Sequence, residues 1–134
     1  MTIATIMTTN VTRISPEDDF RKAQEILDSA PFHHLLVEQA GVLVGIVSDR
    51  DLMSKIASYI DNNPGNAFNK LQSSISVADI MTTQMLVIDR DTPIDAASIL
   101  LLANNISCLP IVNADYVIEG IVTWKDLLKY YVYH

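Results

Sequence analysis

Hydrophobic and polar positions alternate along the chain in an order that predicts its elements. Asn10–Ile14 is a short β-prone run, and apolar residues at helical spacing then predict a helix over 16–29. The apolar stripe of that helix consists of Phe20, Ala23, Ile26 and Leu27. Two strands are predicted next, Leu35–Val37 and Val42–Val47, separated by turn residues at 39–41. A second helix is predicted from Ser48 to about Ile60.

The second half of the chain repeats this order. Its predicted elements are a β-prone run at Met85–Ile88, a helix over 93–104, strands at Leu109–Val112 and Val117–Val122, and a helix from Thr123 to about Tyr133. The turn-rich segment around Asn63-Pro64-Gly65 indicates a linker. We therefore expect a first repeat at 1–60, a linker at 61–75 and a second repeat at 76–134. The order β-α-β-β-α, present twice, predicts an α+β fold.

The residues themselves repeat as well. Ile6-Met7-Thr8-Thr9 returns as Ile80-Met81-Thr82-Thr83, and Gly45–Leu52 returns as Gly120–Leu127 with most apolar positions kept. A period this long, present twice, does not describe a solenoid or a propeller. It predicts two similar units that complete one another and carry related sites.

The segment with chemical potential is Gly-Ile-Val-(Ser/Thr)-x-(Arg/Lys)-Asp-Leu, which joins a strand end to a helix start. Ser48 and Thr123 fall at the helix N-cap, where free backbone N–H groups can bind an anion. Asp51 and Asp126 follow in the first turn and could accept both hydroxyls of a ribose. The same spacing is also a capping box, in which these side chains only satisfy the helix start.

A cation occupies the second helical position in both copies. The helix dipole disfavours Arg50 and Lys125 at this end of a helix, so their presence suggests an anion nearby. The alternative is that both side chains extend into solvent, with Arg50 pairing with Asp49.

Composition excludes several classes of function. The chain carries a net charge of −7 and no basic stripe, which argues against nucleic-acid binding. It lacks a long apolar run and a signal-like N-terminus, so we expect no membrane insertion and a cytoplasmic location. The single Cys108 lies in an apolar strand, as an inert buried thiol would. No nucleophile–base pair or metal cluster indicates an enzyme.

The paired Ile-Met-Thr-Thr openings, the Leu109–Val112 strand and the two Gly-Ile-Val-(Ser/Thr)-x-x-Asp-Leu segments resemble tandem CBS domains, named after cystathionine β-synthase. The resemblance covers almost the whole chain. It implies a pseudo-twofold pair of repeats that binds AMP, ADP, ATP or S-adenosylmethionine between them. It also implies a regulatory role, such as energy sensing, for an unidentified effector protein.

The resemblance also assigns roles to individual residues. Ser48 and Thr123 would contact phosphate or ribose, and Asp51 and Asp126 would hold ribose hydroxyls. The adenine would be enclosed by backbone at Val11, Thr12, Met85 and Leu86. One of His33 and His34 would face phosphate, because neighbouring residues of a strand point to opposite faces. A surface or capping histidine is the alternative at this position. Leu36 stands where the family often has the proline found at Pro110.

Apolar surface exceeds what one small domain needs. The segment 96–103 is apolar on nearly all sides, and the last helix carries Tyr130, Tyr131, Val132 and Tyr133 in succession. We therefore expect a homodimer with helices at its interface, unless these faces are buried within one chain. The leading interpretation is a stand-alone regulatory module for an adenosine-type ligand. The alternative is a ligand-free dimerisation or structural module.

Overall fold

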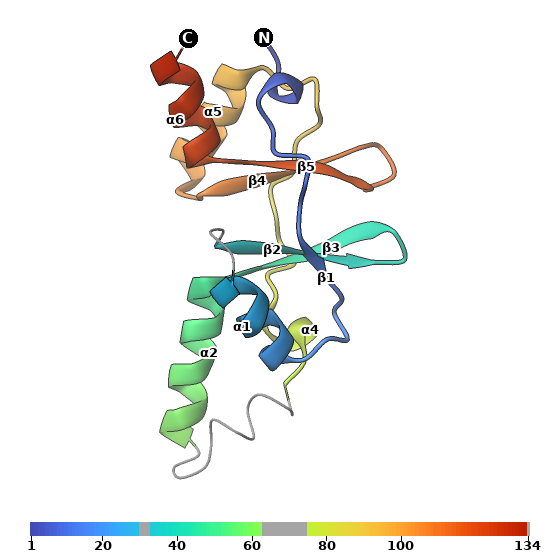
Figure 1. The fold of residues 1–134 in the computed structure, drawn as a ribbon, viewed down its shortest axis with the longest axis vertical. Helices are drawn as coiled ribbons and strands as arrows, with labels where there is room; N and C mark the ends of the chain where they lie inside the picture. The colour runs from blue at the N-terminus through green and yellow to red at the C-terminus, as the bar shows by residue number, and fades with distance from the viewer. Residues whose placement is uncertain (30–32, 63–74, 134) are drawn as a thin grey trace. The chain divides into compact units, whose positions relative to one another are not determined.

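The computed structural model describes residues 1–29, 33–62 and 75–133. The chain forms two compact units (Figure 1). Unit 1 contains Met1–Val11, Gly41–Leu43 and the chain from Leu86 onward, and unit 2 contains Thr12–Ala40 and Val44–Met85. No helix in the described part of the chain is both long and apolar enough to cross a membrane.

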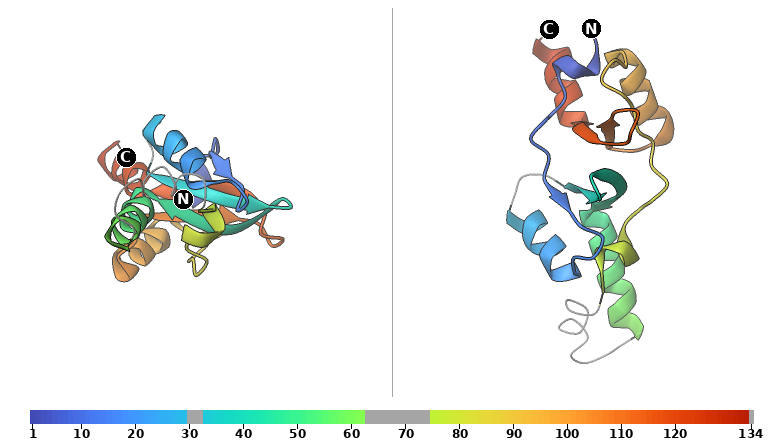
Figure 2. Two further views of the ribbon diagram at one scale, coloured as in Figure 1. Left: turned by 90° about the horizontal axis from the view of Figure 1, so that it is seen from below. Right: turned by 90° about the vertical axis from the view of Figure 1, so that its right-hand side faces the viewer.

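Unit 2 is a small sheet with helices on one face. Its strands, in the order β1-β2-β3, are Arg13–Ile14, His34–Gln39 and Val42–Ser48, with β1 parallel to β2. Its helices are α1 at Phe20–Ser29, α2 at Asp49–Asn62 and α4 at Val77–Ile80, all on the same face of the sheet (Figures 1 and 2). The turn between β2 and β3 places Ala40 and Gly41 at positive φ, as a two-residue hairpin requires.

Unit 1 has the same plan. Its antiparallel strands are β4 at Cys108–Val112 and β5 at Ile118–Thr123. Its helices, α5 at Ile94–Asn104, α6 at Trp124–Tyr133 and the short η1 at Ile3–Thr5, lie on one side of these strands (Figures 1 and 2). Ile88 pairs with Ile111 in the parallel sense, as β1 pairs with β2. The predicted α+β fold of two similar repeats is therefore confirmed, but the β-prone run at Met85–Ile88 forms only this single bridge and no strand.

Each unit has its own hydrophobic core. In unit 2 the buried stripe Phe20, Ala23 and Leu27 of α1 packs with Val37 and Val47 of the sheet. In unit 1 the buried residues of α5 and α6 pack on β4 and β5. The helices contribute Ile94, Ala97, Leu101 and Leu127, and the strands contribute Leu109 and Val122. Burial of such side chains, each stabilising the fold by roughly 1.5–3 kcal/mol, fixes the helices against their strands.

Several details differ from the predicted elements. Helix α1 begins at Phe20 rather than at residue 16, because the Asp18 carboxylate accepts the Ser15 N–H and closes a turn there. Asp19 instead receives the Lys22 N–H in the first turn of α1. Helices η1 and α4 were not predicted; they are three and four residues long, too short for a periodic signal. Most of the predicted linker at 61–75 lies outside the described residues.

Candidate functional site

The predicted binding motifs lie where a strand runs directly into a helix. Ser48 ends β3 immediately before α2, and Thr123 ends β5 immediately before α6. The first residue of each helix is tied to the loop that precedes the neighbouring strand. The Asp49 N–H donates to the His33 carbonyl at 3.1 Å, and the Trp124 N–H donates to the Ser107 carbonyl at 3.3 Å. The two helix starts are therefore built in the same way.

At the start of α2 the capping box is formed. The Ser48 N–H and hydroxyl both donate to Asp51 Oδ2, at 2.8 and 3.0 Å. In return the Asp51 N–H donates to Ser48 Oγ at 3.2 Å. Within the described residues, Asp51 Oδ1 accepts no hydrogen bond, so one oxygen of this half-buried residue is still available.

At the start of α6 the same box carries an additional donor. Asp126 Oδ2 accepts the Thr123 N–H at 2.9 Å and the Thr123 hydroxyl at 3.2 Å. The Asp126 N–H lies 3.5 Å from Thr123 Oγ1, at the limit of a hydrogen bond. The Thr8 hydroxyl also approaches this carboxylate, at 3.3 Å from Oδ1 and 3.5 Å from Oδ2. Both oxygens of Asp126 therefore have donors.

The capping interpretation of the motif is correct as far as hydrogen bonds go. Ser76 and Asp79 make the same box at α4, a helix of four residues for which no ligand role was predicted. The Ser/Thr-x-x-Asp spacing alone thus does not separate a cap from a binding site. Helices α2 and α6 differ from α4 in the groups that surround the capping box.

One backbone N–H at each of these helix starts has no partner. The N–H groups of Asp49 and Asp51 are taken by His33 and Ser48, but that of Arg50 makes no hydrogen bond within the described residues. The backbone N–H of Lys125 on α6 likewise makes no hydrogen bond within the described residues. Each helix start thus presents a free donor at the positive end of the helix dipole.

The side chains of the same two residues are also free. Arg50 and Lys125 are exposed and make no ion pair in the part of the chain that the structure describes. The considered pair between Arg50 and Asp49 does not form, because Asp49 Oδ2 lies 2.6 Å from His33 Nδ1 instead. A cation and a free N–H on one residue can together receive an anionic oxygen.

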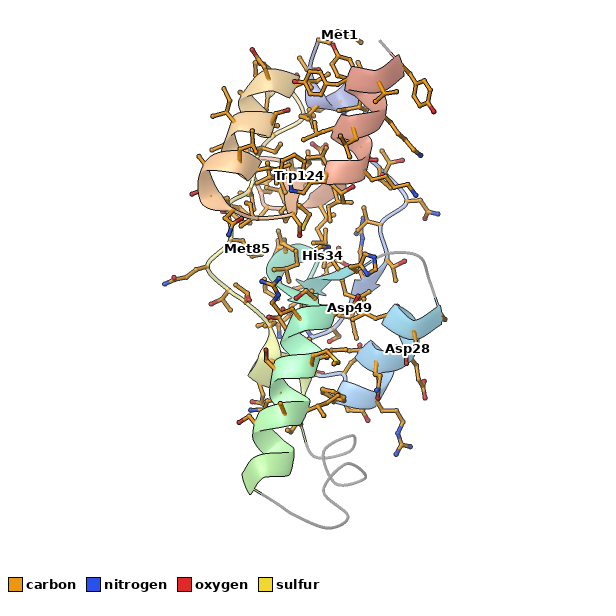
Figure 3. All side chains as sticks on the ribbon, turned by 90° about the vertical axis from the view of Figure 1, so that its left-hand side faces the viewer. Met1, Asp28, His34, Asp49, Met85 and Trp124 are labelled. Atoms are coloured by element: carbon orange, nitrogen blue, oxygen red, sulfur yellow. The ribbon has the colours of Figure 1, made fainter. Side chains whose placement is uncertain are left out.

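The two histidines differ in their surroundings. His33 is exposed and bound to Asp49, so it acts as a partner of the helix start. His34 is half-buried at the start of β2, at the end of unit 2 where α2 begins (Figure 3). Burial lowers the pKa of the His34 imidazole, and His33 lowers it further, while Asp49 and Asp51 act in the opposite direction. His34 is therefore largely neutral at pH 7, where it can donate or accept one hydrogen bond.

The four residues expected to enclose adenine lie where the chain passes from one unit to the other. Val11 is the last residue of the first segment of unit 1, and Thr12 begins unit 2. Met85 ends unit 2, and Leu86 begins the return to unit 1. Each unit thus contains one residue of each pair, and the adenine-binding role of all four stays a prediction.

The motif glycines are explained by segments that the two repeats exchange. Met81 and Thr82 of the second repeat lie against β3, where a Cβ on Gly45 would come within 2.6 Å of Met81 Sδ. The equivalent first-repeat segment lies against β5, where a Cβ on Gly120 would come within 2.8 Å of the Thr8 carbonyl oxygen. Sequence reasoning did not place Thr8 at the site. The repeated Ile-Met-Thr-Thr was the available signal.

Nothing in the described residues supplies a reactive or metal-binding group. Burial raises the pKa of the Cys108 thiol to about 12, which keeps it protonated. Among the described residues no group of three histidine, cysteine or acidic side chains could hold a metal ion. The helix starts of α2 and α6 offer N–H and cationic donors beside a carboxylate, groups that can bind an anion and hydroxyls.

Comparison with known proteins gives the family. The CBS domain model matches residues 3–58 and 77–133. The chloroplastic CBS domain-containing protein CBSX2 of Arabidopsis thaliana is 31% identical over 138 residues, which cover 90% of this chain and 58% of that protein. The crystal structure of CBSX2 in complex with AMP is 27% identical with a TM-score of 0.81, covering 98% of this chain and 96% of that chain.

Other similar proteins share the fold or carry the module in a longer chain. A CBS domain pair crystallised with 5′-methylthioadenosine and S-adenosylmethionine is 23% identical with a TM-score of 0.81, covering 98% of this chain and 99% of that one. Inosine-5′-monophosphate dehydrogenase of Thermoplasma acidophilum is 31% identical over 124 residues, which span 92% of this chain and 22% of the enzyme. The chain also spans 23% of an uncharacterized protein of Methanocaldococcus jannaschii. With both repeats matched, the chain belongs to the CBS domain family.

Proposed function

We propose that this chain is a regulatory module that binds an adenosine-type ligand and signals to an effector protein. Candidate ligands are AMP, ADP, ATP and S-adenosylmethionine. The observation that carries the proposal is the helix start of α2 and α6, where a free N–H, an exposed cation and a carboxylate occur within three consecutive residues. The AMP complex of a relative at 27% identity supports the same ligand class.

The roles of the residues follow from their chemistry. Arg50 and Lys125 would receive phosphate oxygens through the free N–H and the side chain. Asp51 and Asp126 would accept ribose hydroxyls, and Ser48 and Thr123 would hold these carboxylates in place. His33 or His34 would stand beside the phosphate in unit 2, and Val11, Thr12, Met85 and Leu86 would border the adenine. Ligand binding would favour one arrangement of the repeats, which the effector would detect.

The phosphate-binding part of the proposal can be tested with paired charge variants. The double variant Arg50→Gln/Lys125→Gln should weaken AMP binding about tenfold or more, because each lost charge-assisted hydrogen bond costs roughly 1.5–3 kcal/mol. Adenosine, which has no phosphate, should bind both proteins alike. Isothermal titration calorimetry measures both affinities.

The matched control is Lys55→Gln/Lys129→Gln, which removes the same charge from the same two helices away from their starts. It should bind AMP nearly as the unchanged protein does. Absence of heat with AMP, ADP, ATP and S-adenosylmethionine at millimolar concentration would contradict the sensor proposal. It would favour the ligand-free structural module, for which the completed capping boxes are the supporting observation.

We also propose that the chain is a homodimer. Ile99 and Leu102 of α5 are 62% and 65% exposed, and Leu128, Tyr131 and Val132 of α6 are 59%, 55% and 69% exposed. The two helices adjoin, since Ser98 Oγ lies 3.3 Å from the Tyr131 hydroxyl, and we refer to these five exposed residues as the apolar patch. A second copy of the patch is a fitting partner, since a twofold interface pairs a surface with itself. A cytoplasmic location and an energy-sensing role are part of the same proposal.

A further inference from the structure

The two helix starts differ in one respect that bears on ligand binding. Among the residues that the structure describes, Asp126 has donors on both carboxylate oxygens, whereas Asp51 has donors on Oδ2 only. We propose that Thr8 makes the two sites unequal, so that the Ser48/Asp51 site takes the nucleoside first. This inference rests on the proposed binding of an adenosine-type ligand and assigns Thr8 as a specificity-determining residue.

The position of Thr8 is fixed by the exchanged segment. Its N–H and carbonyl pair with the carbonyl and N–H of Ile121 on β5, both at 2.9 Å. This pairing places the Thr8 hydroxyl beside the Asp126 carboxylate on α6, at 3.3 Å from Asp126 Oδ1. Because the backbone is held on both sides of the residue, the hydroxyl does not leave the carboxylate without a rotation of the side chain.

Thr82 is the equivalent residue in unit 2, and it behaves differently. It pairs with Ile46 on β3 through the same two backbone bonds, at 2.9 and 3.0 Å. Its hydroxyl, however, makes no hydrogen bond to Asp51 within the described residues. The same backbone geometry therefore leaves Asp51 Oδ1 open and supplies Asp126 Oδ1 with a donor.

The two hydroxyls of a ribose are both donors toward a carboxylate. At Asp51 the open oxygen accepts one of them without loss of any existing bond. At Asp126 a ribose hydroxyl must share or displace the Thr8 hydroxyl, and Thr8 then has to find another partner. An exchange of one hydrogen bond for another yields less free energy than a new bond to a charged group. We therefore expect about tenfold tighter binding at Asp51 than at Asp126.

Calorimetry with AMP tests the inference. The unchanged protein should show a tight and a weak phase, separated about tenfold in dissociation constant. Asp51→Asn should remove the tight phase, and Asp126→Asn should remove only the weak one. Thr8→Val, which replaces the hydroxyl with a methyl group of similar size, should strengthen the weak phase toward the tight one. Thr82→Val is the matched control and should change neither phase.

The outcomes separate this inference from the proposed function. No heat with AMP in the unchanged protein defeats the proposed function itself. Binding that loses its tight phase in Asp126→Asn, or two phases of equal affinity, overturns the inference while the proposed function stands. If an aspartate variant fails to fold in a thermal melt, the valine pair still decides. Equal AMP titrations for Thr8→Val and the unchanged protein overturn the role of Thr8.

Discussion

At Asp51 and Asp126, capping does not preclude ligand binding, although sequence reasoning treated the two roles as alternatives. The cap uses Oδ2 of each carboxylate, while among the described residues the other oxygen faces no donor at Asp51 and the Thr8 hydroxyl at Asp126. A carboxylate can accept about four hydrogen bonds, so a formed cap does not use up its capacity. A variant that loses stability is therefore no evidence against binding at these residues, and affinity has to be measured separately.

His34 gives unit 2 a dependence of stability on pH. Its pKa in the folded state lies below the ordinary value of 6.5, chiefly because burial disfavours the charged imidazolium. As the pH falls through 6.5, the imidazole takes up a proton in the unfolded chain before it does so in the folded one, which stabilises the unfolded state relative to the folded state. The contribution of neutral His34 to the stability of the fold is thus complete above pH 6.5 and is lost as the pH falls through the lower pKa of the folded state.

We expect the free energy of unfolding to fall between about pH 7.5 and about pH 5.5, and to fall less in His34→Gln. Urea denaturation at a series of pH values measures the slope. His33→Gln keeps His34 but removes the neighbouring imidazole that lowers the His34 pKa further, so it should reduce the slope less than His34→Gln does. Equal slopes for His34→Gln and the unchanged protein would show that His34 does not titrate as described.

At the scale of elements, the glycine-bearing strands and the exchanged segments depend on one another. Gly45 and Gly120 occupy equivalent positions, yet the atoms facing them differ. At Gly45 the obstacle to a Cβ is the flexible thioether of Met81, which can move. At Gly120 it is the Thr8 carbonyl oxygen, held in a backbone pair with Ile121.

Gly120→Ala should therefore destabilise the protein by about 1–3 kcal/mol, as overpacking against rigid atoms does. Gly45→Ala should cost clearly less, since the Met81 side chain can rotate away. Thermal and urea denaturation of the two variants gives the comparison, and each variant serves as the control for the other. An equal or larger loss in Gly45→Ala would contradict the difference between rigid and flexible contacts.

Features that are local along the chain were predictable from the sequence, and contacts between distant segments were not. The order of helices and strands was predictable because it follows from local periodicity, as the stripe Phe20, Ala23 and Leu27 shows. The exchange of segments was not, because Met7-Thr8 and Met81-Thr82 fit either glycine-bearing strand equally well by residue type. The capping boxes at the helix starts were predictable from spacing, and the ligand-binding role of their residues stays a prediction. The contact of Thr8 with Asp126 was not predictable, since it spans nearly the whole chain.

At the scale of the whole molecule, the apolar patch of α5 and α6 leads to a test of association. Leu102→Glu/Leu128→Glu would bury charges in a dimer interface and should convert the dimer into a monomer of 14.9 kDa. Sedimentation equilibrium at micromolar concentration measures the mass. Both residues are more than half exposed, so the fold of unit 1 should be retained in far-ultraviolet circular dichroism.

Met53→Glu is the matched control, because Met53 is 66% exposed on α2 in unit 2 and does not belong to the patch. This variant should keep the dimer mass. A monomer mass for the unchanged protein would refute the homodimer and leave the patch to a different protein. If the Leu102→Glu/Leu128→Glu variant keeps the dimer mass, the interface lies outside the apolar patch.

The exchanged segments also determine when each unit can form during synthesis. Unit 2 is built from residues 12–40 and 44–85, so all of it leaves the ribosome before most of unit 1 is made. Unit 1 joins the first eleven residues to the chain beyond Leu86, and Ile3, fully buried in its core, has to wait for α5 and α6. Until they arrive, the segment Met1–Val11 lacks the rest of its core. Unit 2 should therefore fold first during translation, and unit 1 only once synthesis has passed α6.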